Sequence, residues 1–329
     1  MNRLRLTLGR EERRHQPNVE AYDLYLRARA LVDRRGTESA WKAAALFEQA
    51  IEKDSEFAAA YADLVDAYFF MSTELRGPNR PNALVPAEAL LRMRPAAVKA
   101  LEVDSQLAEA HAAMAMTFSR ECDWTAADRE FLRAIELNPS LTQSYTNYSI
   151  STLLPLRRLE EAERHLNAAL TNDPLSLAVR REIAHLQIIA GRYDEAIASL
   201  RHVLAVDREF PFADVLLAQA LTFSGRLDEA WPIWDSRKHE PGWHFWMAPA
   251  YVLSGRREEA ERMLTMHEHP LRRAVIHAAL GDRDRTVEAL SAAADITPHR
   301  VAIMLVSPGM SFLRGDPKLE PVRKKLKLP

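Results

Sequence analysis

Apolar residues recur along most of the chain at spacings of three and four, which places them on one face of a helix. In each recurrence a small residue is followed by a large one and then by another small one. Small side chains let two helices approach closely, and the large side chain fills the space between them. Two well-formed copies are Ala43, Phe47 and Ala50, and Ala127, Phe131 and Ala134. The pattern predicts packed helices, in agreement with the scarcity of glycine, 10 of 329 residues.

A short sequence that begins with glycine and a charged residue separates these helices. It starts at Gly191, Gly225, Gly255 and Gly281, at spacings of 34, 30 and 26, and a copy without the glycine starts at Arg157, 34 residues earlier. Glycine accepts positive φ where the chain turns out of a helix. Acidic residues follow it, where the dipole of the next helix favours them. These observations predict an internal repeat of helical hairpins.

A second marker has the same period. An Asp or Asn residue closes a helical stretch at Asp54, Asp104, Asn138, Asp173 and Asp207, with spacings of 50, 34, 35 and 34. Two independent markers therefore agree on a unit of about 34 residues, which is a period typical of helical repeat proteins.

The interval of 50 holds a proline-rich insertion at about 76–86. We interpret the insertion as a loop between two helices, and a lid over a binding groove is the alternative hypothesis. Pro95 follows within the next predicted helix. An internal proline destabilises a helix by roughly 3 kcal/mol unless the helix is kinked at that point.

The unit resembles the tetratricopeptide repeat, whose first helix carries Trp-x2-Leu-Gly-x2-Tyr and whose second carries Ala-x3-Phe-x2-Ala-x4-Pro. The third unit matches both helices, with the residues His111, Met114, Ala115, Phe118, Ala127, Phe131, Ala134 and Pro139. The second unit offers Tyr61 and Tyr68, and the fourth offers Tyr145 and Tyr148. The resemblance implies an all-α fold, a right-handed superhelical solenoid of about eight hairpins between residues 18 and 298.

The two ends of the chain resemble one group of such arrays. Residues 18–27 and residues 312–317 look like the opening and closing of the C-terminal arrays of bacterial multidomain signalling proteins of the serine/threonine kinase, adenylate cyclase or winged-helix regulator type. We therefore expect residues 1–17 to be an N-terminal extension or the remnant of a preceding domain, and residues 299–329 to cap the array.

Charge and composition narrow the class of partner. The chain has 44 basic and 46 acidic residues, so no surplus of positive charge is available for a nucleic-acid backbone. Cys122 is the single cysteine, which fits a reducing compartment. No apolar run is long enough to span a membrane. We expect a protein or peptide partner, no nucleic acid and no membrane insertion, in the cytoplasm, or in the periplasm if the chain is a fragment of a membrane-spanning protein. The sequence leaves the oligomeric state open.

Motifs for catalysis are missing from the sequence. It contains no Gly-x-Gly-x-x-Gly, no Gly-Lys-Ser or Gly-Lys-Thr phosphate loop, no His-Glu-x-x-His and no Gly-x-Ser-x-Gly. We therefore expect neither enzymatic activity nor a cofactor. His267, His269 and His277 could converge on a metal, but we interpret them as packing and surface residues. The tryptophans between 231 and 246 form either core or a partner contact, with Trp234 assigned to the core.

The first helix of each unit lines the concave face in the tetratricopeptide family. Transfer of the groove positions of that family predicts ten partner-binding residues, namely Asp66, Phe69, Phe70, Met116, Ser119, Arg120, Arg181, His185, Gln219 and Phe223. The leading hypothesis is a scaffold that binds a peptide or helix in this groove. The alternative is a regulatory or sensory module of a larger signalling enzyme or transcription regulator whose effector domain is absent here.

Overall fold

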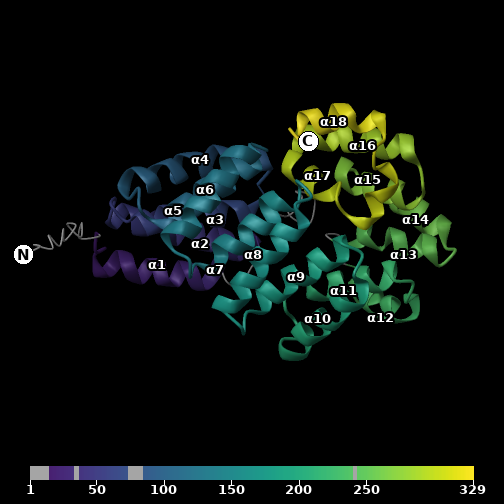
Figure 1. The fold of residues 1–329 in the computed structure, drawn as a ribbon, viewed down its shortest axis with the longest axis horizontal. Helices are drawn as coiled ribbons and strands as arrows, with labels where there is room; N and C mark the ends of the chain where they lie inside the picture. Colours follow the sequence, from purple (N-terminus) through teal and green to yellow (C-terminus); the bar gives the residue numbers. More distant parts are fainter. Residues whose placement is uncertain (1–14, 33–36, 73–83, 240–242) are drawn as a thin grey trace, which may run out of the picture.

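The computed structural model describes residues 15–32, 37–72, 84–239 and 243–329, and all regular structure in these residues is helical (Figure 1). The helices pair as eight successive hairpins that stack side by side. The pairs are α1 (Val19–Val32) with α2 (Thr37–Lys53), α3 (Ala58–Met71) with α4 (Pro86–Val103), α5 (Ala108–Arg120) with α6 (Trp124–Leu137), α7 (Thr142–Tyr148) with α8 (Leu159–Asn172), α9 (Leu177–Ile189) with α10 (Tyr193–Val206), α11 (Ala213–Phe223) with α12 (Leu227–Arg237), α13 (Ala248–Leu253) with α14 (Arg257–Met263), and α15 (Pro270–Ala279) with α16 (Arg283–Ile296). The predicted all-α solenoid is confirmed.

The predicted small–large–small pattern forms the core of the hairpins. Phe47 and Phe131 are fully buried, as are the alanines on either side of each ring. The Phe131 ring stacks on Tyr148 of the next hairpin, with ring centroids 5.2 Å apart. The second helix of each hairpin therefore presents its large residue toward the first helices, and each hairpin buries its apolar face only by stacking on a neighbour.

The turn inside a hairpin has the same geometry in most units. Gly191 has a φ of 78°. The amide of the following residue, Arg192, donates to the carbonyl oxygen of Gln187 at 2.8 Å, which is the bond that ends a helix in the Schellman motif. Two turns place a residue with a side chain in this conformation, since Cys122 has a φ of 54° and Arg157 a φ of 58°. Both of these turns lie close to the last residues of the chain, Cys122 near Lys327 and Arg157 beside a pocket that residues 305–329 help to line.

The fourth hairpin contains a local irregularity. After α7 the chain continues as a single π-helical turn, η1 (Ser149–Leu153). A π-helical turn widens the helix and disturbs its ladder of hydrogen bonds, so a carbonyl group can become available to an outside donor. The carbonyl oxygen of Ser151 accepts such a bond, from the ring nitrogen Nε2 of His299 at 2.9 Å.

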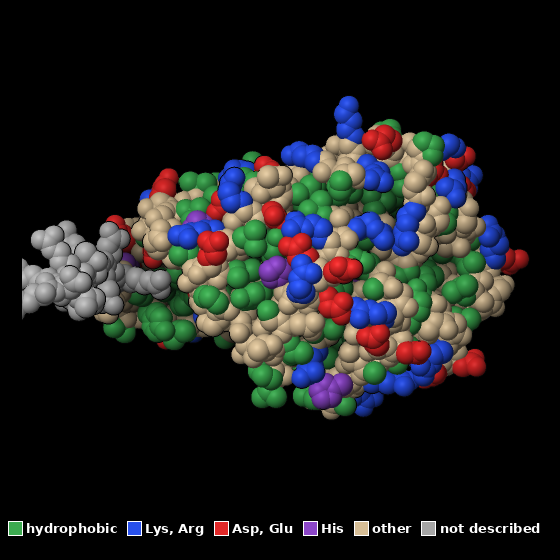
Figure 2. Space-filling view, viewed as in Figure 1, with side chains coloured by type: hydrophobic (Ala, Val, Ile, Leu, Met, Phe, Trp, Pro, Cys, Tyr) green, Lys and Arg blue, Asp and Glu red, His purple; other side chains and the backbone are tan. Residues whose placement is uncertain are grey.

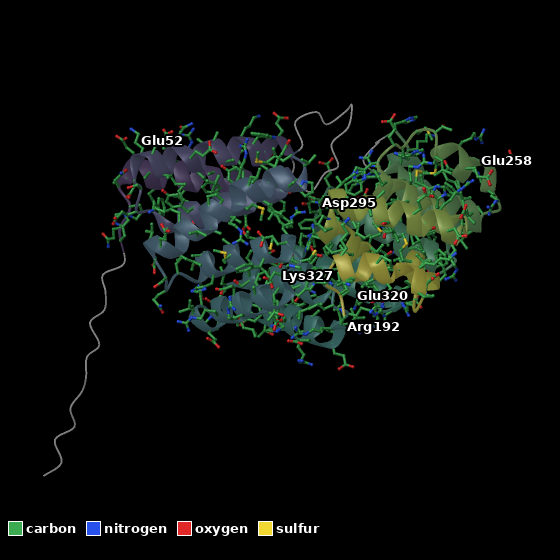
Figure 3. The ribbon with its side chains drawn as sticks, turned by 90° about the horizontal axis from the view of Figure 1, so that it is seen from above. Glu52, Arg192, Glu258, Asp295, Glu320 and Lys327 are labelled. Carbon is green, nitrogen blue, oxygen red and sulfur yellow. The ribbon has the colours of Figure 1, made fainter. Side chains whose placement is uncertain are left out.

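The last 32 residues, 298–329, form a closing segment that returns to the middle of the array. It consists of α17 (Pro298–Met304), the 3-10 turns η3 (Pro308–Leu313) and η4 (Pro317–Leu319), and α18 (Glu320–Lys325). Besides packing on α16, it contacts α5 and the start of α6, far away in sequence. Viewed from above, Lys327 lies where the yellow C-terminal helices meet the blue-green hairpins (Figure 3). The solenoid thus curls until its end touches its third and fourth hairpins.

Much of the proline-rich insertion lies outside the described residues, and so does most of the N-terminal extension. Pro86 opens α4, and Pro95 lies inside that helix as the sequence predicted. None of the described helices is both long and apolar enough to cross a bilayer. Acidic and basic side chains are interspersed on the face seen in the space-filling view (Figure 2), so that face has no extended region of one sign.

Candidate peptide-binding groove

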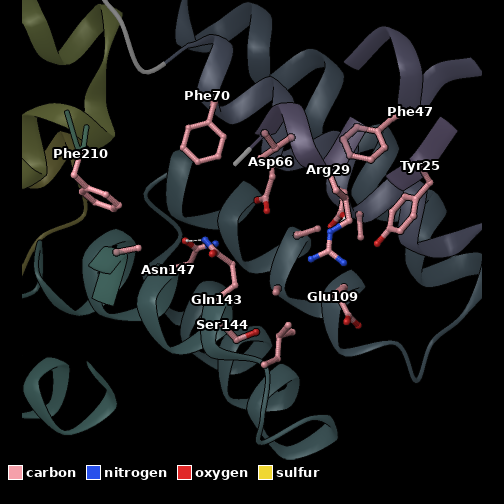
Figure 4. Close-up of a pocket in the computed structure, with 17 residues that line it drawn as sticks. Tyr25, Arg29, Phe47, Asp66, Phe70, Glu109, Gln143, Ser144, Asn147 and Phe210 are labelled. Carbon is pink, nitrogen blue, oxygen red and sulfur yellow. Dashed lines mark hydrogen bonds and ion pairs between the residues drawn. The ribbon is translucent and has the colours of Figure 1, made fainter. Parts of the chain in front are cut away.

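A pocket of about 310 Å³ opens on the inner face of the first five hairpins (Figure 4). Side chains from α1, α3, α5, α7 and α9 line it, together with Phe47 from α2, Leu141 from the turn before α7 and Phe210 from the turn before α11. First helices thus form most of the lining, as the tetratricopeptide resemblance implied. Five successive units contribute because each first helix lies beside the next one along the stack.

The α1 and α3 side of the pocket combines aromatic rings with charge. Arg29 lies 3.6 Å from the carboxylate of Asp63, and its guanidinium is 5.8 Å from the centre of the Tyr25 ring. Burial and the nearby Asp63 raise the pKa of Tyr25, so its hydroxyl stays protonated and able to donate a hydrogen bond. Asp66 and Phe70 line the pocket from the same helix as Asp63.

The α5 and α7 side supplies polar groups that can bind a ligand. Glu109 lines the pocket and makes no ion pair or hydrogen bond through its carboxylate within the described residues. Gln143 donates to the side-chain oxygen of Asn147 at 2.8 Å, and both residues line the pocket. The hydroxyl of Ser144 is buried and has no hydrogen-bond partner among the described residues. Because Ser144 is 0% exposed, its hydroxyl lies behind the pocket surface, and the polar groups within reach of a ligand on this side are Glu109, Gln143 and Asn147.

Two of the ten predicted groove residues line this pocket. They are Asp66 and Phe70, both from α3. Phe69 lies beside them in the sequence, but its ring packs edge-on against Phe70 and under the guanidinium of Arg120, 4.1 Å from the ring centre. Phe69 therefore supports the wall of the pocket from behind.

The three residues predicted on α5 are buried, which corrects that part of the prediction. Met116 accepts a hydrogen bond on sulfur from the Ser151 hydroxyl, and the Ser119 hydroxyl lies 2.8 Å from that of Thr152. Arg120 is 3% exposed and donates to the Ser72 hydroxyl. None of the three offers surface to a partner.

Arg181 is also buried, so its assignment to the groove is corrected as well. It donates to the carbonyl oxygen of Pro211 and pairs with Glu182, and Phe210 and Phe212 flank its guanidinium. His185, on the next turn of α9, keeps part of its surface and lies 3.7 Å from Glu182. Neither residue lines the pocket.

The two positions predicted on α11 also lie away from the pocket. Gln219 and Phe223 are half-buried. Gly309 of the closing segment lies against the Phe223 ring, and a methyl group added at Gly309 would be 3.7 Å from that ring. Tyr193 stacks on the same ring, with ring centroids 6.3 Å apart. Phe223 is therefore partly covered by the chain itself.

Packing between neighbouring units explains these corrections. The family positions assume that the whole length of each first helix faces an open groove. Here the C-terminal half of α5 packs on η1, on the second hairpin and on α17, so only the N-terminal half of α5 lines the pocket. Residues of the first and fourth hairpins were missed because the transfer used other units, although Tyr25 and Asn147 occupy comparable places on their helices.

The histidines and tryptophans occupy structural positions. His267 and His277 are buried, and His269 caps α15 by accepting the Leu271 amide hydrogen at 3.2 Å. Within the part of the chain that the structure describes, no three His, Cys, Asp or Glu residues are grouped so that they could hold a metal ion. Trp234 is fully buried, and Trp243 and Trp246 are half-buried against the core, so these rings pack within the array.

Comparisons with known proteins identify the repeat and the fold. The tetratricopeptide repeat family matches residues 182–210, which contain most of α9 and α10. No curated protein matches the sequence. Among solved structures, the human IFIT1 dimer with m7Gppp-AAAA is 15% identical, with a TM-score of 0.57 over 87% of this chain and 70% of that one. A monomeric IFIT1 mutant with Gppp-AAAA is 16% identical, with a TM-score of 0.56 over 93% and 71%.

Bacterial repeat proteins are also among the similar structures. A tetratricopeptide repeat protein from Parabacteroides merdae is 15% identical, with a TM-score of 0.44 over 88% of this chain and 99% of that one. The family match and the recurring hairpin confirm that the chain carries tetratricopeptide repeats and folds as a solenoid of that type. The likeness to IFIT1, at this identity, establishes a shared fold.

Proposed function

We propose that the chain is a protein-interaction scaffold that binds a segment of a partner polypeptide in the pocket on the inner face of its first five hairpins. The observation that carries this proposal is the carboxylate of Glu109, which lines the pocket and makes no ion pair or hydrogen bond within the described residues. A peptide backbone supplies donors and acceptors at regular intervals. It could bind Glu109 and Asn147 while its side chains contact Tyr25 and Phe70.

The charge of the lining favours a polypeptide over RNA. IFIT1 was solved with m7Gppp-AAAA, so RNA is the alternative class of ligand to be compared with a polypeptide. The described lining of the pocket contains one basic side chain, Arg29, against the three carboxylates of Asp63, Asp66 and Glu109. A surplus of carboxylates repels phosphate groups, whereas RNA sites need a surplus of positive charge.

The alternative is that the array regulates a larger signalling enzyme or transcription regulator. It rests on the resemblance of residues 18–27 and 312–317 to arrays of that kind. In that case the ligand of the same pocket would be a segment of the regulatory machinery. Both versions require polypeptide binding at the same residues, so one experiment tests what they share.

Site-specific photo-crosslinking tests the proposal. A photoreactive phenylalanine analogue replaces Phe70 in the pocket or, as the control, Leu132, which is 40% exposed on α6. A polypeptide from cells of the source organism should crosslink at position 70 and not at 132. The purified partner should then bind at least tenfold more weakly to Asn147→Ala, and equally well to Arg129→Ala on α6. Crosslinking to RNA, equal crosslinking at both positions, or full binding by Asn147→Ala would contradict the proposal.

A further inference from the structure

A second, smaller pocket lies where the closing segment meets the fourth hairpin. It has a volume of about 190 Å³ and shares no lining residue with the groove. Its walls are largely apolar, with Leu156 from the turn after η1 and Val306, Met310 and Leu313 from the closing segment. Arginine side chains lie among these apolar groups, so the pocket combines an apolar space with positive charge.

One of these arginines, Arg157, stands in a conformation that favours glycine. Its φ is 58°, and the corresponding turn positions in the next four hairpins hold glycines with φ between 74° and 80°. A side chain at such a position carries backbone strain, which points to a use for that side chain. In the third hairpin, Cys122 has the same conformation, and its side chain is buried in the core. Arg157 is exposed, so packing does not explain its presence.

The charges around the pocket leave two guanidinium groups unpaired. The side chains of Arg157 and Arg314 make no hydrogen bond or ion pair within the described residues, although both line the pocket. The carboxylate of Asp316, also in the lining, is held by Arg283 at 2.6 Å. Arg323 donates to the carbonyl oxygen of Pro329. Partial burial and then the positive charge of Arg314 lower the pKa of Arg157, so the two like charges oppose each other.

We propose that this pocket binds the C-terminal residue of a partner polypeptide, with its α-carboxylate between Arg157 and Arg314 and an aliphatic side chain in the apolar space. Arginine matches the planar geometry of a carboxylate, and an anion between the two groups would relieve their repulsion. The volume is below the roughly 300–1,000 Å³ typical of small-molecule sites, which suits a single anchoring residue. The unpaired positive charge of Arg157 and Arg314 favours an anion, and the apolar walls favour an aliphatic group next to it.

The test uses a labelled pentapeptide, Gly-Ser-Gly-Ser-Leu, with a free α-carboxylate or with a C-terminal carboxamide, and measures fluorescence anisotropy with the full chain. The carboxylate peptide should bind saturably, and the carboxamide at least tenfold more weakly. Arg157→Gly and Arg314→Gln should each weaken the carboxylate peptide at least tenfold. Lys324→Gln, which removes a cation from α18 outside the pocket, should change the affinity less than twofold.

Arg157→Gly keeps the experiment interpretable, because glycine suits the positive φ and the variant should melt at the same temperature or higher. The absence of saturable binding, equal binding of the two peptides, or full binding by Arg157→Gly would overturn the proposal. Glu109→Lys in the groove should leave this binding unchanged. If Glu109→Lys abolishes it, the peptide occupies the groove, and the second pocket is not its site. Failure of the groove proposal would leave this result untouched.

Discussion

The indole nitrogen of Trp124 donates a hydrogen bond to the backbone carbonyl oxygen of Leu326 at 2.8 Å, across 202 positions of the chain. Trp124 opens α6 in the third hairpin, and Leu326 is the C-cap residue that follows α18. Together with the bond from His299 to Ser151, this contact ties the end of the solenoid to its middle. In an open solenoid each repeat contacts only its neighbours, whereas here the closing segment adds a long-range contact.

Trp124→Phe tests this contact. Phenylalanine keeps an aromatic ring but is smaller than the indole and lacks its N–H, so the buried carbonyl oxygen of Leu326 loses its donor and we expect a loss of about 1–3 kcal/mol in the free energy of unfolding. Hydrogen exchange should accelerate in residues 298–329. Trp231→Phe is the matched control, because it removes an indole bond to Ser254 between adjacent hairpins. Unchanged exchange in the closing segment of Trp124→Phe would show that this bond does not hold it.

Arg120→Ala tests whether Arg120 is a structural residue. Its guanidinium donates to Ser72 and to the carbonyl oxygen of Phe69, and burial followed by the charge of Arg300 lowers its pKa to about 9. Removal deletes both hydrogen bonds and the packing of the buried guanidinium on the Phe69 ring, while the Ser72 hydroxyl keeps its bond to the Phe69 carbonyl oxygen, so the free energy of unfolding should fall by about 2–4 kcal/mol. Arg129→Ala, at a side chain that is 67% exposed, should change it by less than about 0.5 kcal/mol. Equal urea midpoints for the two variants would restore Arg120 as a candidate binding residue.

Buried histidines make the stability of the array dependent on pH. Burial, then the charge of Arg272, lowers the pKa of His267 to about 4, and burial, then Arg120, lowers that of His299 to about 3. Because the ordinary pKa of histidine is about 6.5, the unfolded chain binds more protons between that value and the folded pKa. The stabilisation is complete above about pH 6.5 and decreases as the pH falls toward 4, by about 1–2 kcal/mol per histidine at pH 5.

His267→Leu checks this pH dependence by urea denaturation between about pH 7 and pH 5, a range above the titration of most carboxylates. The variant should lose less stability than the wild type over this range, because one buried titrating group has been removed. His202→Leu, at an exposed position, is the control and should retain the wild-type slope. Parallel slopes for all three proteins would contradict the prediction.

The repeat could be read from the sequence because it rests on local rules. Phe131 predicted a buried large residue between two small ones, and Gly191 predicted a helix end with positive φ, and both are confirmed. The closing segment could not be placed in this way. Its contacts join residues such as His299 and Ser151, 148 positions apart, which no periodic pattern encodes. The groove prediction failed at Ser119 and Arg120 because their side chains contact η1 and the second hairpin, and the place of a residue within the repeat does not reveal such contacts between hairpins.

Phe131→Ala tests the core of the repeat directly. Deletion of this fully buried ring, which stacks on Tyr148, should cost about 3–5 kcal/mol in the free energy of unfolding. Leu132→Ala, the next residue on the same helix and 40% exposed, should cost less than about 1 kcal/mol. Comparable costs at the two positions, measured by chemical denaturation, would mean that the helix presents a different face to the core.

Phe223 and Gly309 provide the last test, because they distinguish an open concave face from one covered by the closing segment. In an open groove, Phe223→Ala would weaken partner binding and leave stability unchanged. In the structure the ring packs on Tyr193 and against Gly309, so the variant should lose about 1–3 kcal/mol of stability. Gly309→Ala is the matched variant. Its added methyl group would lie at an ordinary contact distance of 3.7 Å from the ring, so stability should be unchanged or rise by up to about 1 kcal/mol. A stable Phe223→Ala variant with impaired partner binding would instead place Phe223 in an accessible groove.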